Sequence, residues 1–232
     1  DAAVEDAAKY KKMHDDGELV VWITVDGFFW FPRTLFGIED HLYAFYDNPE
    51  LMHRMNQDNT HYIKYVFEKM SEAIHPDFMT FAEDMSYNLG PMLSEDMFDE
   101  FLLPYYKQTV PYIESLGTIP LVDTDGQLEG MIPWLQRAGI RGALPLERKA
   151  GVDVNRIRQN YPDFLVIGAY DKMVMDVSEE AMREEFERLL PTMKSGGYIP
   201  SVDHQTPPGV SLENYWKYLT LLKEYSIKGA IR

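Results

Sequence analysis

An aspartate and a histidine that could do acid–base or metal chemistry stand side by side near the end of the chain, as Asp203 and His204. They follow a short apolar run, residues 198–202, and two prolines soon after them prevent further strand pairing. Ser211 then suits the N-cap of a helix beginning at Leu212. A strand that ends on reactive side chains and turns into a helix is typical of a β/α barrel, whose active sites lie at the strand C-termini. The alternative is a turn in which both side chains only bond the backbone.

The other predicted strands also end on acidic residues. Apolar runs of strand length predict strands at residues 19–25, 78–82, 119–122, 142–146, 164–169 and 198–202. The acids that follow them are Asp26, Glu83, Asp84, Asp123, Asp125, Glu147, Asp171 and Asp203. Any one of these acids could simply cap a helix or form a turn. Together they predict a cluster at one edge of the sheet, whose carboxylates must share protons, pair with cations or hold a metal.

The sharpest metal-site candidate combines Asp123, Asp125 and His204. The two aspartates are two residues apart, so their side chains would share a face if the strand continued through them. Two carboxylates and one imidazole suit a divalent ion such as Zn²⁺, Mn²⁺ or Fe²⁺. The same residues could instead act as general acid and base. In the structural alternative, Asp125 and Gly126 form a turn and Asp123 caps the next helix.

Four consecutive aromatic residues, 28–31, follow the first predicted strand. They predict the apolar wall of a pocket, in which Phe29 and Trp30 contact a flat or methyl-bearing ligand. Arg33, which follows this segment, is a cation that could pair with the strand-end acids. The alternative is a lid that packs on a neighbouring helix or subunit, which is compatible with a homodimer.

Helical patterns separate the predicted strands. They cover residues 2–14, 49–73, 94–116, 130–138, 153–160, 178–194 and 212–225. Strands that alternate with helices, without hairpin-type turns, predict parallel β/α units. Six units fit either an open doubly wound sheet or most of an eight-unit barrel, and no Gly-rich phosphate fingerprint follows any strand.

Charge and composition exclude several classes of function. The 232 residues carry a formal net charge of -16, which opposes nucleic acid or an anionic membrane surface as a partner. The apolar runs are far shorter than the roughly 18 residues that a membrane span needs. The sequence contains no cysteine, so disulfides, thiol nucleophiles and thiolate metal sites are excluded. Without an export signal, a cytoplasmic location is expected.

Several motifs follow one another in a distinctive order. They are 77–85 (DFMTFAEDM), 88–95 (NLGPMLSE), 103–107 (LPYYK), 123–126 (DTDG), 145–147 (PLE), 168–172 (GAYDK), 203–208 (DHQTPP) and 213–214 (EN). In this arrangement the chain resembles the uroporphyrinogen decarboxylase superfamily, which also contains the cobamide-dependent methyltransferases.

The resemblance implies an α/β fold, the TIM (β/α)8 barrel, with its active site at the strand C-termini. Residues 1–232 would form a single barrel domain that supplies six C-terminal units, with an N-terminal part expected to precede them. His204 falls where the decarboxylases have an active-site histidine, and Asp84 falls near a substrate-contacting serine. The methyltransferases bind zinc with a His-x-Cys motif and a later Cys, at positions that match Asp123, Asp125 and His204. That thiolate set is absent here, so the resemblance implies a harder, oxygen-rich site.

Three functions are predicted. The first is a methyltransferase-like enzyme that acts on a small substrate, with a corrinoid (cobalamin) protein as partner. The second is a uroporphyrinogen decarboxylase of porphyrin biosynthesis, which needs no cofactor. The third is a non-catalytic binding module. For the enzymes, Glu83 and Asp84 join the three metal-site candidates as catalytic residues. The expected substrate-binding residues are Phe29, Trp30, Arg33, Glu147, Tyr170, Asp171 and Asp203.

Overall fold

All six predicted strands are present and belong to one sheet. The computed structural model describes residues 2–230, so residues 1 and 231–232, at the two ends of the predicted domain, lie outside the described residues. The sheet strands are β1 (Trp22–Asp26), β2 (Phe78–Ala82), β5 (Ile119–Thr124), β6 (Gly142–Pro145), β7 (Leu165–Tyr170) and β8 (Tyr198–Val202). Their order is β1-β2-β5-β6-β7-β8, and the β1/β2, β6/β7 and β7/β8 pairs are parallel. Parallel strands alternating with helices confirm the predicted α/β class and match part of a (β/α)8 barrel.

The chain divides into two compact units that alternate along the sequence. The first unit comprises the residues up to Asp84 together with Leu93–Val122 and Trp134–Ile140. The second comprises Met85–Met92, Asp123–Pro133 and the residues from Arg141 onward. Strand β5 and helix α7 (Ile132–Ala138) contribute residues to both units. The organisation of the whole chain as a single domain stays a prediction.

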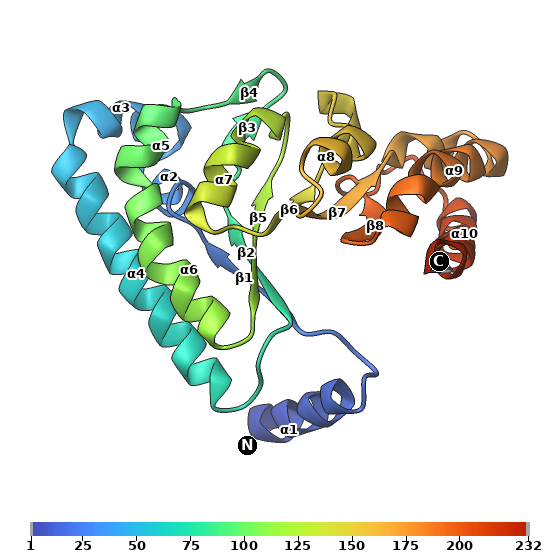
Figure 1. Ribbon diagram of the computed structural model, residues 1–232, viewed down its shortest axis with the longest axis horizontal. Coiled ribbons are helices and arrows are strands. Elements are labelled where there is room, and N and C mark those ends of the chain that lie inside the picture. The colour runs from blue at the N-terminus through green and yellow to red at the C-terminus, as the bar shows by residue number, and fades with distance from the viewer. Residues whose placement is uncertain (1, 231–232) are drawn as a thin grey trace. The chain divides into compact units, whose positions relative to one another are not determined.

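In the first unit, helices α4 and α6 run side by side (Figure 1). Besides part of α7, the helices are α1 (Ala2–Asp15), α2 (Trp30–Phe36), α3 (Ile38–Asp47), α4 (Pro49–Ser71), α5 (Glu95–Phe101) and α6 (Leu103–Ser115). The helical pattern predicted over residues 94–116 is interrupted at Leu102, two residues before Pro104, whereas α6 continues through Pro111. A proline in the first turn lacks only an N–H that has no helical partner, so α6 tolerates Pro104.

Aromatic side chains form the core of the first unit. Phe28 meets Tyr106 edge-on, with ring centroids 4.9 Å apart, and Phe81 meets the same tyrosine at 5.2 Å. Phe98 stacks on Tyr106 from another side at 6.0 Å. Such contacts add to the burial of large apolar surfaces, so this cluster fixes the start of α6 against β2.

The second unit contains a small hairpin that the sequence prediction missed. Strands β3 (Ser86–Tyr87) and β4 (Gly90–Pro91) pair antiparallel. Each has only two residues, which is too short for an alternation of apolar and polar residues to predict a strand. The other elements of this unit are η1 (Glu129–Met131), η2 (Arg148–Ala150), α8 (Val154–Asn160), η3 (Lys172–Asp176), α9 (Glu179–Ser195) and α10 (Leu212–Ala230).

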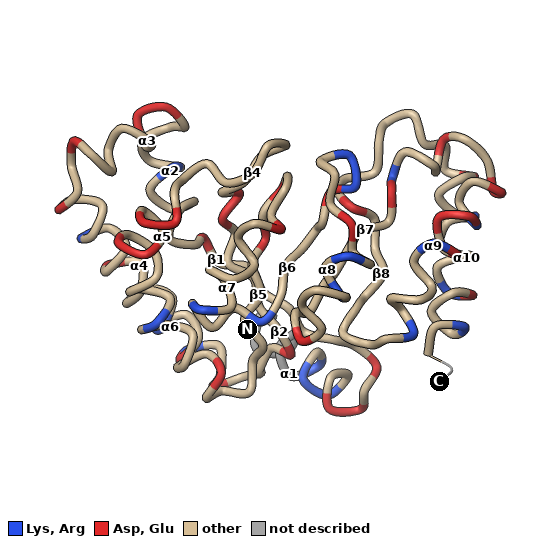
Figure 2. Tube along the Cα trace, turned by 45° about the horizontal axis from the view of Figure 1, so that its top comes forward, with Lys and Arg blue, Asp and Glu red and all other residues tan. Residues whose placement is uncertain are grey.

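Helices α9 and α10 lie side by side in the second unit (Figure 1). Both basic and acidic residues lie along each of these helices (Figure 2). Two ion pairs join them, Arg183 with Glu224 at 2.9 Å and Lys228 with Glu187 at 2.6 Å. Each exposed ion pair of this kind contributes little to stability. The packing of buried aromatic rings therefore contributes most to holding these helices against β7. Tyr170 of β7, for example, lies 4.5 Å from Phe186 of α9 between ring centroids.

Across residues 2–230, no helix combines the length and the apolar character that crossing a membrane requires.

Candidate active site

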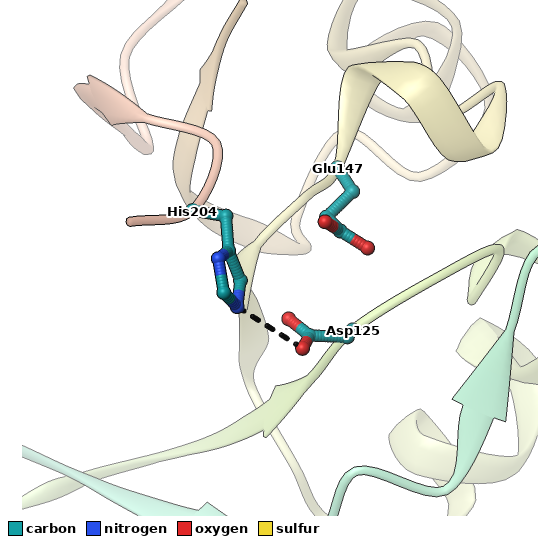
Figure 3. Close-up of side chains that lie close together, drawn as sticks. All are labelled: Asp125, Glu147 and His204. Carbon is teal, nitrogen blue, oxygen red and sulfur yellow. Dashed lines mark ion pairs between the residues drawn. The ribbon is translucent and has the colours of Figure 1, made fainter. Parts of the chain in front are cut away.

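Three side chains of the second unit come together beyond the C-terminal ends of their strands (Figure 3). Asp125 directly follows β5, Glu147 lies two residues past β6, and His204 lies two residues past β8. Each offers one ligand atom, and these atoms all lie within 4.8 Å of one another. All three side chains are partly exposed, so solvent reaches the cluster.

Ion pairs and a backbone hydrogen bond hold these side chains in place. Nε2 of His204 lies 3.2 Å from Oδ2 of Asp125. The backbone N–H of Gly126 donates to Oε2 of Glu147 at 3.1 Å, and Nζ of Lys172 lies 3.4 Å from Oε1 of Glu147. Two carboxylates therefore meet one imidazole and one ammonium, which offsets their mutual repulsion.

The donor set fits a divalent metal ion, but its members differ from those predicted. One imidazole nitrogen and two carboxylates suit Zn²⁺, Mn²⁺ or Fe²⁺. Among the described residues, the group that could hold an ion contains Asp125, Glu147 and His204, and does not contain Asp123. Strand β5 ends at Thr124, so the alternation that would place Asp123 and Asp125 on one face does not extend to Asp125.

The hairpin positions the loop that carries Asp125. The hydroxyl of Ser86 donates to the backbone carbonyl of Asp125 at 2.5 Å, and the N–H of Gln127 donates to the carbonyl of Tyr87 at 2.8 Å. Between these bonds, Gly126 has φ +77° and runs so close to Tyr87 that an added Cβ would lie 2.5 Å from the Tyr87 Cα. Only glycine combines this conformation with this close approach.

Asp203 lies beneath the cluster rather than in it. Its side chain is fully buried, and its carboxylate accepts the backbone N–H of Arg148 at 2.9 Å and that of Lys172 at 3.2 Å. Burial raises the pKa of Asp203, while these two hydrogen bonds and the Lys172 charge act in the opposite direction. Asp203 therefore follows the alternative that the sequence left open, because its carboxylate bonds the backbone.

Two other predicted substrate-binding residues of the second unit also have structural partners. Tyr170 is fully buried, and its hydroxyl donates to the carbonyl of Met182 at 3.3 Å. Asp171 caps η3 by accepting the N–H of Met173 at 2.9 Å. Their predicted contacts with a substrate stay predictions.

Glu83, in the first unit, is a buried acceptor for the loop after β1. It accepts the backbone N–H groups of Phe28 at 2.8 Å, Phe29 at 2.7 Å and Trp30 at 3.1 Å, and the hydroxyl of Tyr106 also donates to it. Burial raises the pKa of Glu83 to about 7, although these four donors favour the ionised form. Glu83 has no exposed surface and organises this loop, and its predicted catalytic role stays a prediction.

The aromatic segment after β1 is partly core. Phe28 and Phe29 are fully buried, and Phe29 lies edge-on to the ring of His41 with centroids 4.6 Å apart. Trp30 and Phe31 are half-buried. Packing on a neighbouring helix, the alternative to a pocket wall, thus describes Phe28 and Phe29, whereas a ligand contact of Trp30 stays a prediction.

Arg33 and Asp84 form a separate cluster in the first unit. The guanidinium of Arg33 donates to the backbone carbonyl of Asp84 at 2.7 Å and to its carboxylate at 3.2 Å. It also lies over the ring of Trp30, 4.9 Å from the centroid. Asp84 has φ +43°, a left-handed conformation that costs energy in a non-glycine residue and is supported here by the arginine.

Sequence reasoning missed the roles of Glu147, Lys172 and Tyr106. Glu147 is predicted only as a substrate contact, and Lys172 is not among the predicted site residues. Their position after successive strands was a usable signal, because strand ends of neighbouring β/α units converge. Tyr106 gave no such signal, since it lies within a helix and meets Glu83 only through tertiary packing.

One curated relative is 26% identical to the chain over 196 residues, which is 79% of this chain and 51% of the relative. It is named uroporphyrinogen decarboxylase and comes from Chloroherpeton thalassium (strain ATCC 35110 / GB-78). The chain thus spans about half the length of this relative. A solved structure titled "Crystal Structure of Citrate Synthase SbnG" aligns at 10% identity and a TM-score of 0.37, covering 94% of this chain and 78% of that one, which is too distant to support an argument.

The family described as Uroporphyrinogen decarboxylase (URO-D) matches residues 33–225. This range contains all three side chains of the cluster and well over half of the 232 residues. The chain therefore belongs to the uroporphyrinogen decarboxylase family.

Proposed function

We propose that the chain carries the reactive centre of a methyltransferase-like enzyme of the URO-D family, formed by Asp125, Glu147 and His204. The observation that supports this proposal is the convergence of their three ligand atoms within 4.8 Å. A divalent ion would be held there, and the substrate would be a small molecule whose methyl group passes to a corrinoid protein. Because the chain spans about half of its curated relative, the activity is proposed for the intact protein.

Each residue has a defined part in this centre. A bound ion would polarise or orient the substrate. Asp125 orients the imidazole of His204 through Nε2, and the imidazole accepts or gives up a proton when no ion occupies the site. Glu147 is oriented by the N–H of Gly126, and Lys172 balances its charge.

Elemental mass spectrometry on the intact protein, purified without chelator, tests the ion. We expect about one equivalent of a transition metal in the wild type, and its loss in Asp125→Ala, Glu147→Gln and His204→Ala. Asp123→Asn is the matched control and should keep the metal, because Asp123 lies outside the group of ligand atoms. Metal retained in the His204 variant, or absent from the wild type, would contradict a metal site.

Methyl transfer tests the reaction itself. The intact protein, with a panel of small methyl donors, should methylate cob(I)alamin, and His204→Ala should abolish this transfer. No transfer across the panel, from protein that carries its metal, would count against the methyltransferase.

A decarboxylase is the second candidate, because the curated relative at 26% identity is named uroporphyrinogen decarboxylase. Here His204 and Asp125 would act as an acid–base pair, and no ion would be needed. Carbon dioxide release from uroporphyrinogen by metal-depleted intact protein would favour this candidate. The acidic cluster argues against it, since a substrate rich in carboxylates needs cations to receive it.

A further inference from the structure

Three loops of the second unit meet at one buried carboxylate. We propose that Asp203 is the positioning residue that fixes Glu147, Lys172 and His204 relative to one another. This inference deepens the proposed function and rests on it for the roles of Glu147 and His204.

The hydrogen bonds of Asp203 reach the loops after β6 and β7. Its Oδ2 accepts the N–H of Arg148, the residue directly after Glu147, at 2.9 Å. Its Oδ1 accepts the N–H of Lys172 at 3.2 Å. Since His204 is the next residue in the chain, one carboxylate fixes the backbone beside all three groups.

Asp203 also places the side chain of Lys172. Nζ of Lys172 lies 3.7 Å from Oδ1 of Asp203 and 3.4 Å from Oε1 of Glu147. The lysine side chain is only 13% exposed, so its ammonium has little access to other partners. The lysine therefore links the buried carboxylate of Asp203 to the partly exposed one of Glu147.

Burial makes this arrangement rigid. A carboxylate with no exposed surface is tolerated only when hydrogen bonds and a counter-charge replace its lost hydration. If the Asp203 carboxylate were removed, the N–H groups of Arg148 and Lys172 would lose their acceptors, and both loops would seek new ones. A displacement of about 1 Å at a reactive centre is enough to reduce its rate severely.

Hydrogen–deuterium exchange of the intact protein tests the positioning directly. Asp203→Ala should raise exchange in two segments that are distant in sequence, residues 147–152 and 171–177. Ser178→Ala is the control, because Ser178 caps α9 through the N–H of Ala181 and contacts none of the three positioned groups. This variant should lose stability without raising exchange in residues 147–152. Asp203→Asn keeps the side-chain volume and replaces the alanine variant if that protein does not fold.

Cobalt binding separates positioning from a merely structural role. Titration with Co²⁺, followed by visible absorption, should give a dissociation constant at least tenfold higher in the Asp203 variants, with a shifted spectrum, and an unchanged one in Ser178→Ala. Unchanged exchange in either segment, or cobalt binding within twofold of wild type and with the same spectrum, would overturn the inference.

If the wild type binds no Co²⁺, the proposed ion is refuted. Hydrogen–deuterium exchange then still decides whether Asp203 positions the loops. In that case, raised exchange in both segments supports positioning by Asp203, and a uniform rise throughout the second unit overturns it.

Discussion

Two buried side chains of the first unit, Glu83 and His41, change stability with pH in opposite directions. Burial raises the pKa of Glu83 from 4.5 to about 7. Burial, followed by the charge of Arg33, lowers the pKa of His41 from 6.5 to about 4. Folded Glu83 therefore retains a proton that the unfolded chain releases, whereas folded His41 lacks a proton that the unfolded chain binds. The two contributions nearly cancel between about pH 4.5 and 6.5.

Glu83→Gln should uncover the contribution of His41. Its free energy of unfolding should rise from pH 4.5 to 6.5, because the unfolded chain binds the extra proton in this range. The variant should also be about 2 kcal/mol less stable than wild type at pH 6, because an amide nitrogen cannot accept the backbone N–H groups that Glu83 accepts. Urea denaturation at several pH values measures both effects. A profile as flat as that of the wild type would contradict the pKa of His41.

His41→Phe should have the reverse effect. Both ring nitrogens of His41 are buried without a hydrogen-bond partner, so a phenyl ring avoids their desolvation. The free energy of unfolding should fall by about 3 kcal/mol as pH rises from 4.5 to 7, since Glu83 then contributes alone. The exposed His75 provides the control, and His75→Phe should keep the wild-type profile. If the free energies of unfolding of His41→Phe and His75→Phe changed with pH in the same way, the lowered pKa of His41 would be refuted.

Lys172→Met should strengthen cation binding at the cluster. The ammonium of Lys172, 3.4 Å from Glu147, repels a divalent ion and competes for this carboxylate. Its removal should lower the Co²⁺ dissociation constant about tenfold, equivalent to about 1.4 kcal/mol. Lys149→Met removes an exposed charge two residues after Glu147 and should change binding less than twofold. Weaker binding in the Lys172 variant would show that the lysine supports the ion instead of competing with it.

At the scale of elements, carboxylates at strand ends act chiefly as acceptors for neighbouring loops. Glu83, after β2, holds the loop after β1, and Glu147, after β6, accepts an N–H from the loop after β5. Asp203, after β8, does the same for the loops after β6 and β7. A carboxylate is well suited to this task, because it accepts several N–H groups at once. The strand-end acids from which a reactive edge is predicted therefore also hold the loops at that edge in place.

Close packing of strands makes one glycine of the second unit hard to replace. Gly168 of β7 has φ +110°, and an added Cβ would lie 1.9 Å from the carbonyl oxygen of Pro145. Gly117 also has positive φ, +84°, but has nothing within 4 Å. Gly117→Ala should therefore cost about 1 kcal/mol of stability, from backbone strain alone. Gly168→Ala should cost about 3 kcal/mol or more, because β6 and β7 must separate. Equal losses in urea denaturation would contradict this difference.

Local pattern predicts the elements far better than it predicts the side-chain contacts at their ends. All six strands were predictable, because each is an apolar run bounded by turn residues. Helices α2 and α3 were missed, since the aromatic segment masks the start of α2 and Gly37 separates the two short helices. The choice of Glu147 over Asp123 depends on where β5 ends and how the next loop bends. The burial of Asp203 depends on two distant N–H groups, and neither feature has a local signature.

At the scale of the whole molecule, excess negative charge opposes folding. The chain has 38 acidic and 22 basic residues, and several of the ion pairs between them are exposed. At low ionic strength the acidic side chains repel one another most strongly when the chain is folded and compact. Screening of exposed charges increases as the Debye length falls to about 10 Å at 0.1 M salt.

Salt should therefore stabilise a polypeptide of this sequence. Its free energy of unfolding should rise by about 1 kcal/mol between 0.02 and 0.2 M KCl, because repulsion among exposed carboxylates is screened. Thermal unfolding followed by circular dichroism measures the change, and sucrose, which screens no charge, provides the control. A decrease in stability with KCl would mean that attractive ion pairs outweigh the net repulsion.

The way the two units share the chain has a consequence for dividing the protein. The polypeptide passes from one unit to the other after residues 84, 92, 122, 133 and 140, so no single cut separates them. A break after residue 140 leaves Asp125 on one fragment, and Glu147 and His204 on the other. Neither fragment holds a complete ligand set. If the cluster holds the proposed ion, two halves produced from separate genes should bind it only on reassociation, which makes this position a natural place to split the protein into a reporter of its own assembly.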